Sequence, residues 1–102
     1  MLKVLKSKIR ELKVEECKVE YDEGSITIPR DIMKNAKLVA FEHVEVNSKY
    51  NKGRISTYVI PGDRVELNGG AANHFKEGEI VHVNSFTYIP DALAEYHKPK
   101  IV

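Results

Sequence analysis

Hydrophobic and polar residues alternate in five short runs of this chain, and each run is bounded by Gly, Pro, Asn or Asp. Alternation with a period of two is typical of β-strands, because successive side chains point to opposite faces. The runs are also rich in Val, Ile, Tyr and Thr, which favour strands. They cover residues 26–28, 43–46, 55–60, 65–67 and 79–86. The pattern therefore predicts a mainly β chain.

Helical signals are limited to two short segments. Pro29 suits the first turn of a helix over residues 30–36, and Pro90 with Asp91 can open a turn that continues over residues 92–96. Neither segment is long enough to cross over between parallel strands. Several short strands without such crossovers favour a closed barrel, which leaves no exposed sheet edge. We expect a small β-barrel with short peripheral helices.

Two segments between predicted strands are typical of hairpin turns, namely Asn51-Lys52-Gly53 and Pro61-Gly62-Asp63. The tail over residues 97–102 has no periodicity. It is expected either to fray or to dock against the domain as an extended strap, and composition leaves both possibilities open.

Length and charge narrow the class of protein. At 102 residues the chain supports one domain, and charged residues nearly cancel to a net charge of +1, so no overall field attracts nucleic acid or a membrane surface. The single Cys17 excludes a disulfide within the chain, and the first residues lack the apolar run of a secretion signal or membrane span. We expect a cytoplasmic protein. A domain this small gains pocket walls by self-association, so we also expect a homo-oligomer with sites at subunit boundaries.

Gly24 and Ser25 lie directly before a predicted strand. One interpretation is an ordinary turn, in which glycine supplies an uncommon backbone conformation and serine precedes the strand. In the other, Ser25 Oγ attacks the Gly24 carbonyl, which glycine leaves uncrowded. That reaction needs a neighbouring hydroxyl to polarise the carbonyl. For these two residues alone, the turn is the stronger interpretation.

The run over residues 54–60 brings several polar side chains together. Strand alternation places Arg54, Ser56 and Tyr58 on one face and Thr57 on the other, unless a bulge redirects the chain. Arg54 with Tyr58 can bind a carboxylate and supply an acid. A surface arginine beside a half-buried tyrosine is the simpler interpretation of this segment alone.

The run NGGAA at residues 68–72 offers backbone N–H groups that small side chains leave accessible to a carboxylate or an oxyanion. A tight turn explains the glycines equally well, and the spacing of a phosphate-binding loop is absent. The histidines are too scattered to predict a metal site, so each is expected to be a surface or strand residue. They are His43, His74, His82 and His97.

Six segments, taken in order, are similar to segments of the bacterial pyruvoyl-dependent aspartate 1-decarboxylases. They are KSKI (6–9), YDEGSITI (21–28), RISTYVIPG (54–62), NGGAA (68–72), GEIV (78–81) and HKPKIV (97–102). The resemblance covers nearly the whole chain, and its specificity comes from the ordered set. It implies a double-psi β-barrel that assembles as a homotetramer.

The resemblance also implies a self-processing precursor that is cut between Gly24 and Ser25 into a β chain (1–24) and an α chain (25–102). In this family the serine performs an N-to-O acyl shift on the glycine carbonyl. Elimination and hydrolysis then leave a pyruvoyl group in place of Ser25, and a threonine that matches Thr57 hydrogen-bonds the Gly24 carbonyl during processing. The expected cofactor is this pyruvoyl group, without a metal or pyridoxal phosphate.

For the reaction, the resemblance implies that L-aspartate is converted to β-alanine and CO2 for pantothenate and coenzyme A biosynthesis. The pyruvoyl carbonyl forms a Schiff base with the substrate amine. Tyr58 is the expected proton donor, Arg54 binds a substrate carboxylate, and Lys8 comes from the adjoining subunit. The remaining substrate-binding residues are expected to be Thr57, Asn68, Gly69, Gly70 and Ala71.

The chain departs from the family pattern around the predicted site. Asp22 and Glu23 place one residue more than usual between Tyr21 and Gly24, which can relax the strain at the cleavage bond or be absorbed as a bulge. The other departures are Arg10 in place of histidine, Gly70 in place of alanine, His82 in place of an apolar residue, and a shortened segment over residues 61–68.

A different class of protein shares part of the same pattern. The run GSITIPR (24–30) followed by a short helix also resembles AbrB-like swapped-hairpin DNA-binding domains, in which Arg30, Lys34 and Lys37 would contact phosphates. Those domains are much shorter, and the STYVIPG and NGGAA segments would have no role in them. A third hypothesis is an unprocessed barrel paralogue that acts as a binding module.

Overall fold

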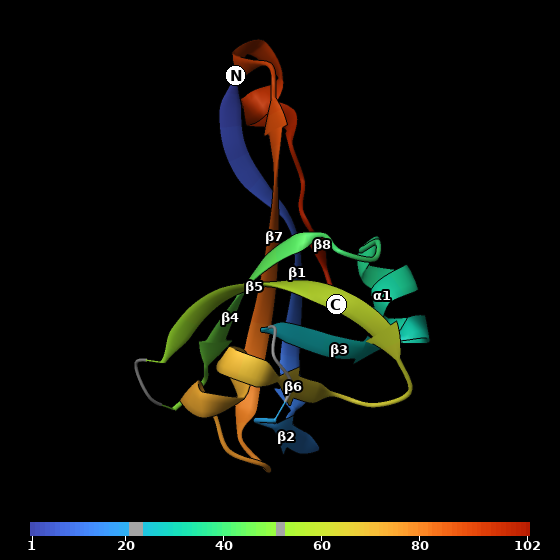
Figure 1. Ribbon diagram of the computed structural model, residues 1–102. Coiled ribbons are helices and arrows are strands. Elements are labelled where there is room, and N and C mark those ends of the chain that lie inside the picture. Colours follow the sequence, from blue (N-terminus) through green and yellow to red (C-terminus); the bar gives the residue numbers. More distant parts are fainter. Residues whose placement is uncertain (21–23, 51–52) are drawn as a thin grey trace.

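The computed structural model describes residues 1–20, 24–50 and 53–102. Within these residues eight strands form one mixed sheet in the order β2-β6-β3-β5-β4-β7-β1-β8 (Figure 1). The strands are β1 (Leu2–Lys13), β2 (Glu16–Lys18), β3 (Ser25–Pro29), β4 (His43–Ser48), β5 (Arg54–Gly62), β6 (Glu66–Asn68), β7 (Ile80–Ile89) and β8 (Lys100–Ile101). The prediction of a mainly β chain with short helices is confirmed, and the double-psi barrel stays a prediction.

Three short helices accompany the sheet in the described ranges: α1 (Arg30–Ala36) and the 3₁₀ helices η1 (Gly69–His74) and η2 (Asp91–Tyr96). The two predicted helical segments are confirmed at α1 and η2. Pro29 precedes the first turn of α1, and Lys37 ends the helix in a left-handed conformation (φ 59°) with its N–H donating to the Lys34 carbonyl. In the described parts of the chain, no helix is long and apolar enough to cross a membrane.

The longest strand, β1, is absent from the sequence prediction. It pairs with β7 in antiparallel register, but the register shifts between Leu5 and Ser7 and again between Ile9 and Leu12. Glu11, inside the second shift, has a left-handed conformation (φ 60°). Each bulge adds an unpaired residue and so breaks the alternation of polar and apolar side chains. The period-two signal is lost although the strand is continuous.

The two predicted hairpin turns have different outcomes. β4 and β5 are antiparallel neighbours, as a hairpin requires, although Asn51 and Lys52 lie outside the described residues. The hairpin predicted at Pro61-Gly62-Asp63 is wrong. β5 continues to Gly62, and β6 pairs with β3 rather than with β5. β6 cannot pair with β5, because β3 and β4 already occupy the two edges of β5.

β3 lies at the centre of this part of the sheet, between β5 and β6. Its first four residues are all buried, and Ile26 and Ile28 are fully enclosed by the hydrophobic core. A strand that is covered on both faces has no exposed positions, and residues 25–28 (SITI) are all buried. The bond between Gly24 and Ser25 is therefore held at the start of a rigid, central strand.

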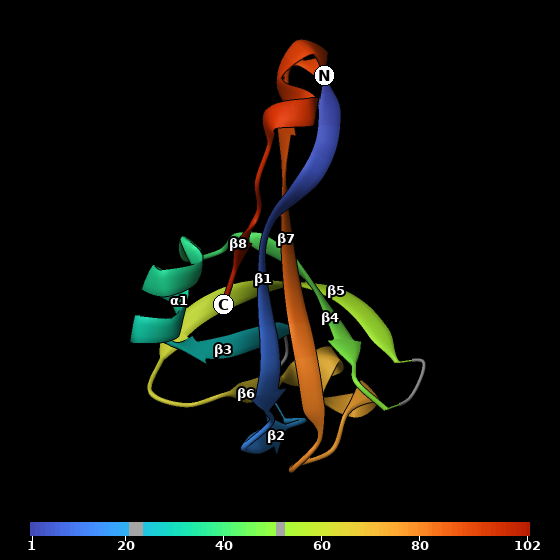
Figure 2. The same ribbon diagram turned by 180° about the vertical axis from the view of Figure 1, so that it is seen from behind.

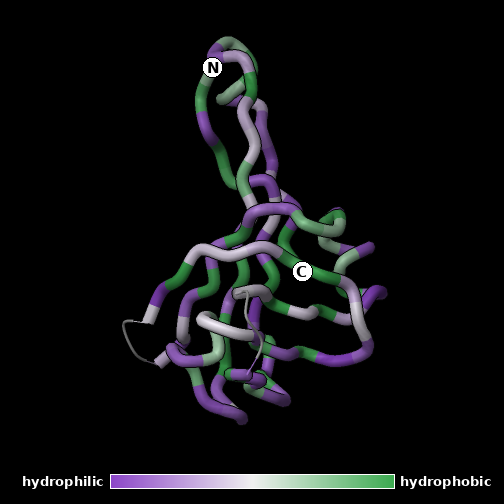
Figure 3. Tube along the Cα trace, in the orientation of Figure 1, coloured by the Kyte–Doolittle hydropathy of each residue, from purple (hydrophilic) through white to green (hydrophobic). Residues whose placement is uncertain are grey.

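Part of β1 and β7 extends beyond the body of the molecule as an arm, with η2 at its tip (Figures 1 and 2). The molecule is consequently elongated, with a longest extent of 45 Å. The tail returns along the arm and docks as a strap: β8 pairs in parallel with β1, and Val102 N donates to the Lys8 carbonyl at 2.8 Å. Hydrophilic residues gather at the opposite end, around β2 and the turn before β7 (Figure 3).

Candidate active site

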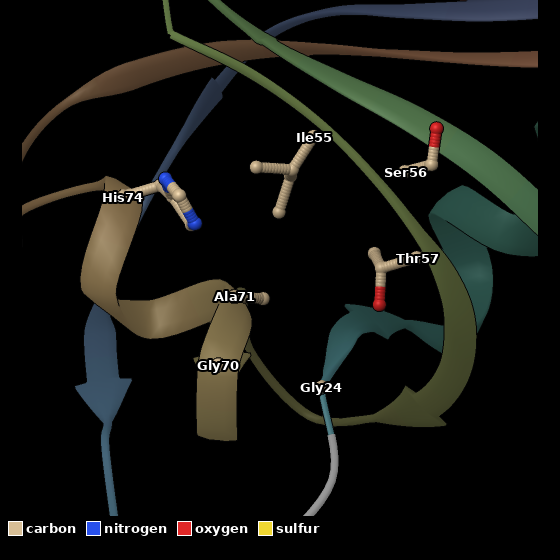
Figure 4. Close-up of a pocket in the computed structure, with 7 residues that line it drawn as sticks. All are labelled: Gly24, Ile55, Ser56, Thr57, Gly70, Ala71 and His74. Carbon is tan, nitrogen blue, oxygen red and sulfur yellow. The ribbon is translucent and has the colours of Figure 1, made fainter.

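A pocket of about 370 Å³ opens beside the start of β3. Its walls come from three parts of the chain that are distant in sequence: the residue before β3, the first half of β5, and η1 (Figure 4). The lining residues are Gly24, Ile55, Ser56, Thr57, Gly70, Ala71 and His74. Four of the residues predicted from the sequence, Gly24, Thr57, Gly70 and Ala71, are therefore brought together here.

Hydrogen-bonding groups converge on Gly24. A Cβ atom built on Gly24 would lie 3.5 Å from the backbone nitrogen of Ala71, 4.0 Å from that of Gly70 and 3.9 Å from Thr57 Oγ1. The Thr57 hydroxyl points toward Gly24, and Ser56 points away from it (Figure 4). Backbone N–H groups and a hydroxyl arranged in this way can stabilise negative charge that develops on a nearby oxygen. A hydroxyl therefore lies beside Gly24, as the interpretation of Ser25 as a nucleophile requires.

Ser25 is held from the other side by Asn68. The two residues face each other across the antiparallel pair β3–β6, and Asn68 Nδ2 donates to Ser25 Oγ at 3.0 Å. Both side chains are buried, with 5% of Ser25 and 1% of Asn68 exposed. Within the described residues, Asn68 Oδ1 is buried without a hydrogen-bond partner. Asn68 therefore fixes the Ser25 hydroxyl and leaves one acceptor unused beside it.

The backbone of η1 places the glycines of the NGGAA run. Gly69 is buried and has a left-handed conformation (φ 60°), which glycine adopts without a steric penalty. This residue turns the chain from β6 into η1, so that Gly70 and Ala71 reach the pocket wall. Gly69 itself is not among the lining residues, and its contribution is the turn.

Arg54 and Tyr58 do not line this pocket. They leave β5 on the face opposite to Thr57, as strand alternation predicts. Arg54 is exposed, and its Nε donates to Asn47 Oδ1 at 3.0 Å. The Tyr58 ring lies 5.9 Å from the ring of Phe41. These two predicted residues are thus separated from Gly24 within one copy of the chain.

Lys8 shares the face of Arg54 and Tyr58. A cross-strand row runs from Lys8 of β1 through Asn84 of β7 and Glu45 of β4 to Ser56 of β5. Residues directly opposite one another in adjacent strands project on the same side of a sheet. One face of the β1–β7–β4–β5 sheet therefore carries Lys8, and the same face of β5 carries its neighbours Arg54 and Tyr58.

The sequence analysis missed three lining residues: Ile55, Ser56 and His74. His74 was expected to be an ordinary surface or strand residue, but its ring faces the pocket from the end of η1, on the far side of Ile55 from Thr57 (Figure 4). Its spacing of six residues from Asn68 carries no signal unless η1 is known to be helical. The predicted segment YDE at residues 21–23 lies outside the described residues.

The charged residue nearest to Asn68 along β6 is Glu66. Burial of the Glu66 carboxylate raises its pKa, but hydrogen bonds from Arg64 and Lys18 outweigh burial and hold the pKa below the ordinary value of 4.5. Glu66 therefore stays ionised and tied to neighbouring cations. No group of three or more His, Cys, Asp or Glu side chains in residues 1–20, 24–50 and 53–102 is arranged to hold a metal ion.

Comparison with known proteins points to one family. A family model described as aspartate decarboxylase matches residues 1–102. The chain is 37% identical to an aspartate 1-decarboxylase of Porphyromonas gingivalis, over 99% of this chain and 88% of that protein. It is 36% identical to one of Clostridium kluyveri, over 99% and 82% of the two chains, and 38% identical to one of Phocaeicola vulgatus, over 100% and 90%.

Proposed function

Because the chain belongs to the aspartate decarboxylase family, we propose that it removes the α-carboxylate of L-aspartate to give β-alanine and CO2, after cutting itself between Gly24 and Ser25. The observation that carries this proposal is the surroundings of that bond. Thr57 Oγ1 and two backbone nitrogens converge on Gly24, while Asn68 holds the Ser25 hydroxyl. One domain, residues 1–102, then yields a β chain (1–24) and an α chain (25–102).

Cleavage begins with the attack of Ser25 Oγ on the Gly24 carbonyl carbon. The bond from that carbon to the Ser25 nitrogen breaks, and an ester replaces the amide. Negative charge on the carbonyl oxygen during this step is stabilised by the Thr57 hydroxyl. The ester then loses the Gly24 carboxylate by elimination, and water replaces the nitrogen of the remaining residue, which releases ammonia and leaves a pyruvoyl group at position 25. Fixed positions for both reacting groups lower the entropic cost of the attack.

The residues around Ser25 fit a pyruvoyl group. Such a group lacks the serine hydroxyl and the preceding chain, so it needs an opening beside Gly24, which the pocket provides. When present, it supplies a carbonyl that binds the substrate amine and withdraws electrons as CO2 leaves. Asn68 has a buried Oδ1 that can accept a polar hydrogen of the substrate, and the backbone nitrogens of Gly70 and Ala71, at the pocket wall, would be available to a substrate carboxylate.

The position of Arg54, Tyr58 and Lys8 supports a site that is completed by another copy of the chain. All three lie on the face of the sheet opposite to Thr57, and none of them lines the pocket beside Gly24. We assign them to the pocket of a neighbouring subunit in a homotetramer. There Arg54 and Lys8 bind the substrate carboxylates, and Tyr58 returns the proton to the carbon that loses CO2.

The test is a mass measurement of the purified, denatured protein together with an assay of β-alanine formation. The expected result is two fragments, 1–24 and 25–102, with a pyruvoyl group blocking the second, and release of β-alanine from L-aspartate. Ser25→Ala is expected to remain one chain and to form no β-alanine. Full β-alanine formation by the uncut Ser25→Ala chain would contradict the proposed mechanism, and a cut wild-type chain that leaves aspartate unchanged would contradict the proposed substrate.

The DNA-binding hypothesis has no support comparable to the family match, which covers the whole chain. The residues that it requires are also engaged differently. Arg30 Nη1 forms an ion pair with Asp63 at 3.1 Å, and Lys37 occupies the left-handed end of α1. The decarboxylase proposal accounts for the STYVIPG and NGGAA segments, whose residues form the pocket around Gly24.

A further inference from the structure

Thr27, which was not among the predicted site residues, is hydrogen-bonded to the same amide group that holds Ser25. Asn68 Nδ2 donates to Thr27 Oγ1 at 3.0 Å and to Ser25 Oγ at 3.0 Å. An asparagine amide carries two hydrogens, so both are used. Ser25 and Thr27 are two residues apart in β3 and therefore project on the same face of the sheet, which is also the face of Asn68, directly opposite Ser25 in β6.

The second hydrogen bond matters because the last torsion of an asparagine side chain is soft. Its amide group rotates over a broad energy well and is poorly fixed by a single partner. Two hydrogen bonds to neighbouring points of one strand define the plane of the amide. All three side chains are buried, so water does not compete for these groups; 7% of Thr27 is exposed.

Gly62, at the end of β5, leaves room for the methyl group of Thr27. A Cβ atom built on Gly62 would lie only 2.3 Å from Thr27 Cγ2, so the threonine methyl group occupies the space that any side chain at position 62 would need. Threonine has few accessible rotamers because its Cβ is branched. With the methyl group seated over Gly62, the hydroxyl of Thr27 faces Asn68.

We propose that Gly62 and Thr27 orient the side chain of Asn68, and that Asn68 in turn positions the Ser25 hydroxyl for chain cleavage. The inference rests on the proposed self-cleavage. Thr27 is a positioning residue because it acts through Asn68. A displacement of the attacking oxygen by about 1 Å can slow a reaction about 100-fold, so loss of one of the two hydrogen bonds is expected to slow cleavage measurably.

The experiment follows the appearance of the 25–102 fragment with time by mass spectrometry, starting from uncut, refolded protein. Thr27→Val keeps the shape and the methyl group but removes the acceptor, and cleavage is expected to slow roughly 10-fold or more. Thr27→Ser keeps the acceptor and is expected to cleave within roughly threefold of the wild-type rate. Thr87→Val, on β7, is the matched control and should leave the rate unchanged.

A rescue experiment separates positioning from general damage. Gly62→Ala is expected to slow cleavage because the new methyl group displaces the Thr27 side chain. Combining it with Thr27→Ser removes the methyl group that clashes and keeps the hydroxyl, so the double variant should cleave faster than Gly62→Ala alone. Urea unfolding of both variants in the uncut Ser25→Ala background measures the change in stability, and a recovery of cleavage that only follows a recovery of stability would overturn the positioning role.

The possible failures are distinguishable. If the wild-type chain is never cut, the proposed function is wrong, and the positioning role is wrong with it. If the wild-type chain is cut and Thr27→Val is cut at the same rate, only the positioning role is overturned. In the uncut Ser25→Ala background, Thr27→Val should also shift the side-chain amide signals of Asn68 in an NMR spectrum, and unchanged signals would equally overturn the inference.

Discussion

Thr57 and Tyr58 are consecutive residues, yet they lie on opposite faces of β5. Thr57 lines the pocket beside Gly24, and Tyr58 projects from the face that also carries Arg54. We assign the first residue to cleavage of its own chain and the second to proton transfer in a neighbouring subunit. A single short strand thereby contributes to two sites and to two different chemical steps.

Replacing Thr57 tests this division at the cleavage step. Thr57→Val keeps the branched shape but removes the hydroxyl that faces Gly24, and loss of one such donor typically slows a reaction about 100-fold. The fraction of cut chain measured over time should fall accordingly. Thr57→Ser retains the hydroxyl and should cleave at a rate close to that of the wild type. Equal cleavage by Thr57→Val and the wild type would remove Thr57 from the processing step.

Among single residues, the sequence predicted those whose chemical role follows from the residue type within a short segment. Gly24, Thr57, Gly70 and Ala71 were predicted and now line one pocket. His74 was missed because its contribution depends on where η1 ends. Thr27 could be predicted as a strand residue, but its bond to Asn68 depends on the antiparallel pairing of β3 with β6, which no local pattern encodes.

At the scale of elements, β2 and β6 are short parallel strands that are joined by side-chain charges as well as by backbone bonds. Lys18 of β2 lies 3.3 Å from the Glu66 carboxylate of β6, and Arg64 donates to the same carboxylate at 2.8 Å. Arg64 also forms an ion pair with Glu16. Because β6 continues into Asn68, this charge network supports the strand that holds Ser25.

The network predicts a pH dependence of stability. Because the pKa of Glu66 is lower in the folded protein than its ordinary value of 4.5, its contribution is complete above that pH and is lost as the pH falls through the folded value. Glu66→Gln should lower the free energy of unfolding by about 1 kcal/mol at pH 7 and much less near pH 3. Urea unfolding at both pH values measures the difference, with exposed Glu95→Gln as the control. A loss that is equal at both pH values would contradict this origin.

The elements themselves were predictable to different degrees. The regular strands β3, β4 and β5 alternate cleanly and were found from their pattern. β1 was missed because its two bulges, one containing Glu11 in a left-handed conformation, interrupt the period of two. The pairing order was also beyond local patterns: the sequence places β6 directly after β5, but β3 is inserted between them.

At the scale of the whole molecule, the assignment of Lys8 to a neighbouring pocket can be tested by mixing defective chains. Ser25→Ala and Lys8→Ala should each be inactive alone. In mixed oligomers, a pocket with an intact Ser25 from one chain can receive Lys8 from the other, and random assembly should restore roughly a quarter of the wild-type activity. Assays of β-alanine formation on co-expressed, separately tagged chains measure the recovery.

A matched pair of variants provides the control for this mixing experiment. Ser25 and Asn68 belong to the same chain and are joined by a hydrogen bond. Co-expressing Ser25→Ala with Asn68→Ala therefore gives no pocket with both residues intact, and activity should stay absent. Recovery with this pair, or none with the Lys8 pair, would show that the site is not shared between subunits in the proposed way.

The position of β5 between two partners also determines where the chain can change in length. β5 is antiparallel to β4 on one side and parallel to β3 on the other, so both ladders fix its register. One residue inserted within β5 would exchange its two faces, which would turn Thr57 away from Gly24 and Tyr58 into the core. A change in length at the exposed Asp63, directly after β5, leaves both ladders intact. Evolution can therefore vary the chain there, whereas a single inserted codon inside β5 would abolish maturation and turnover together.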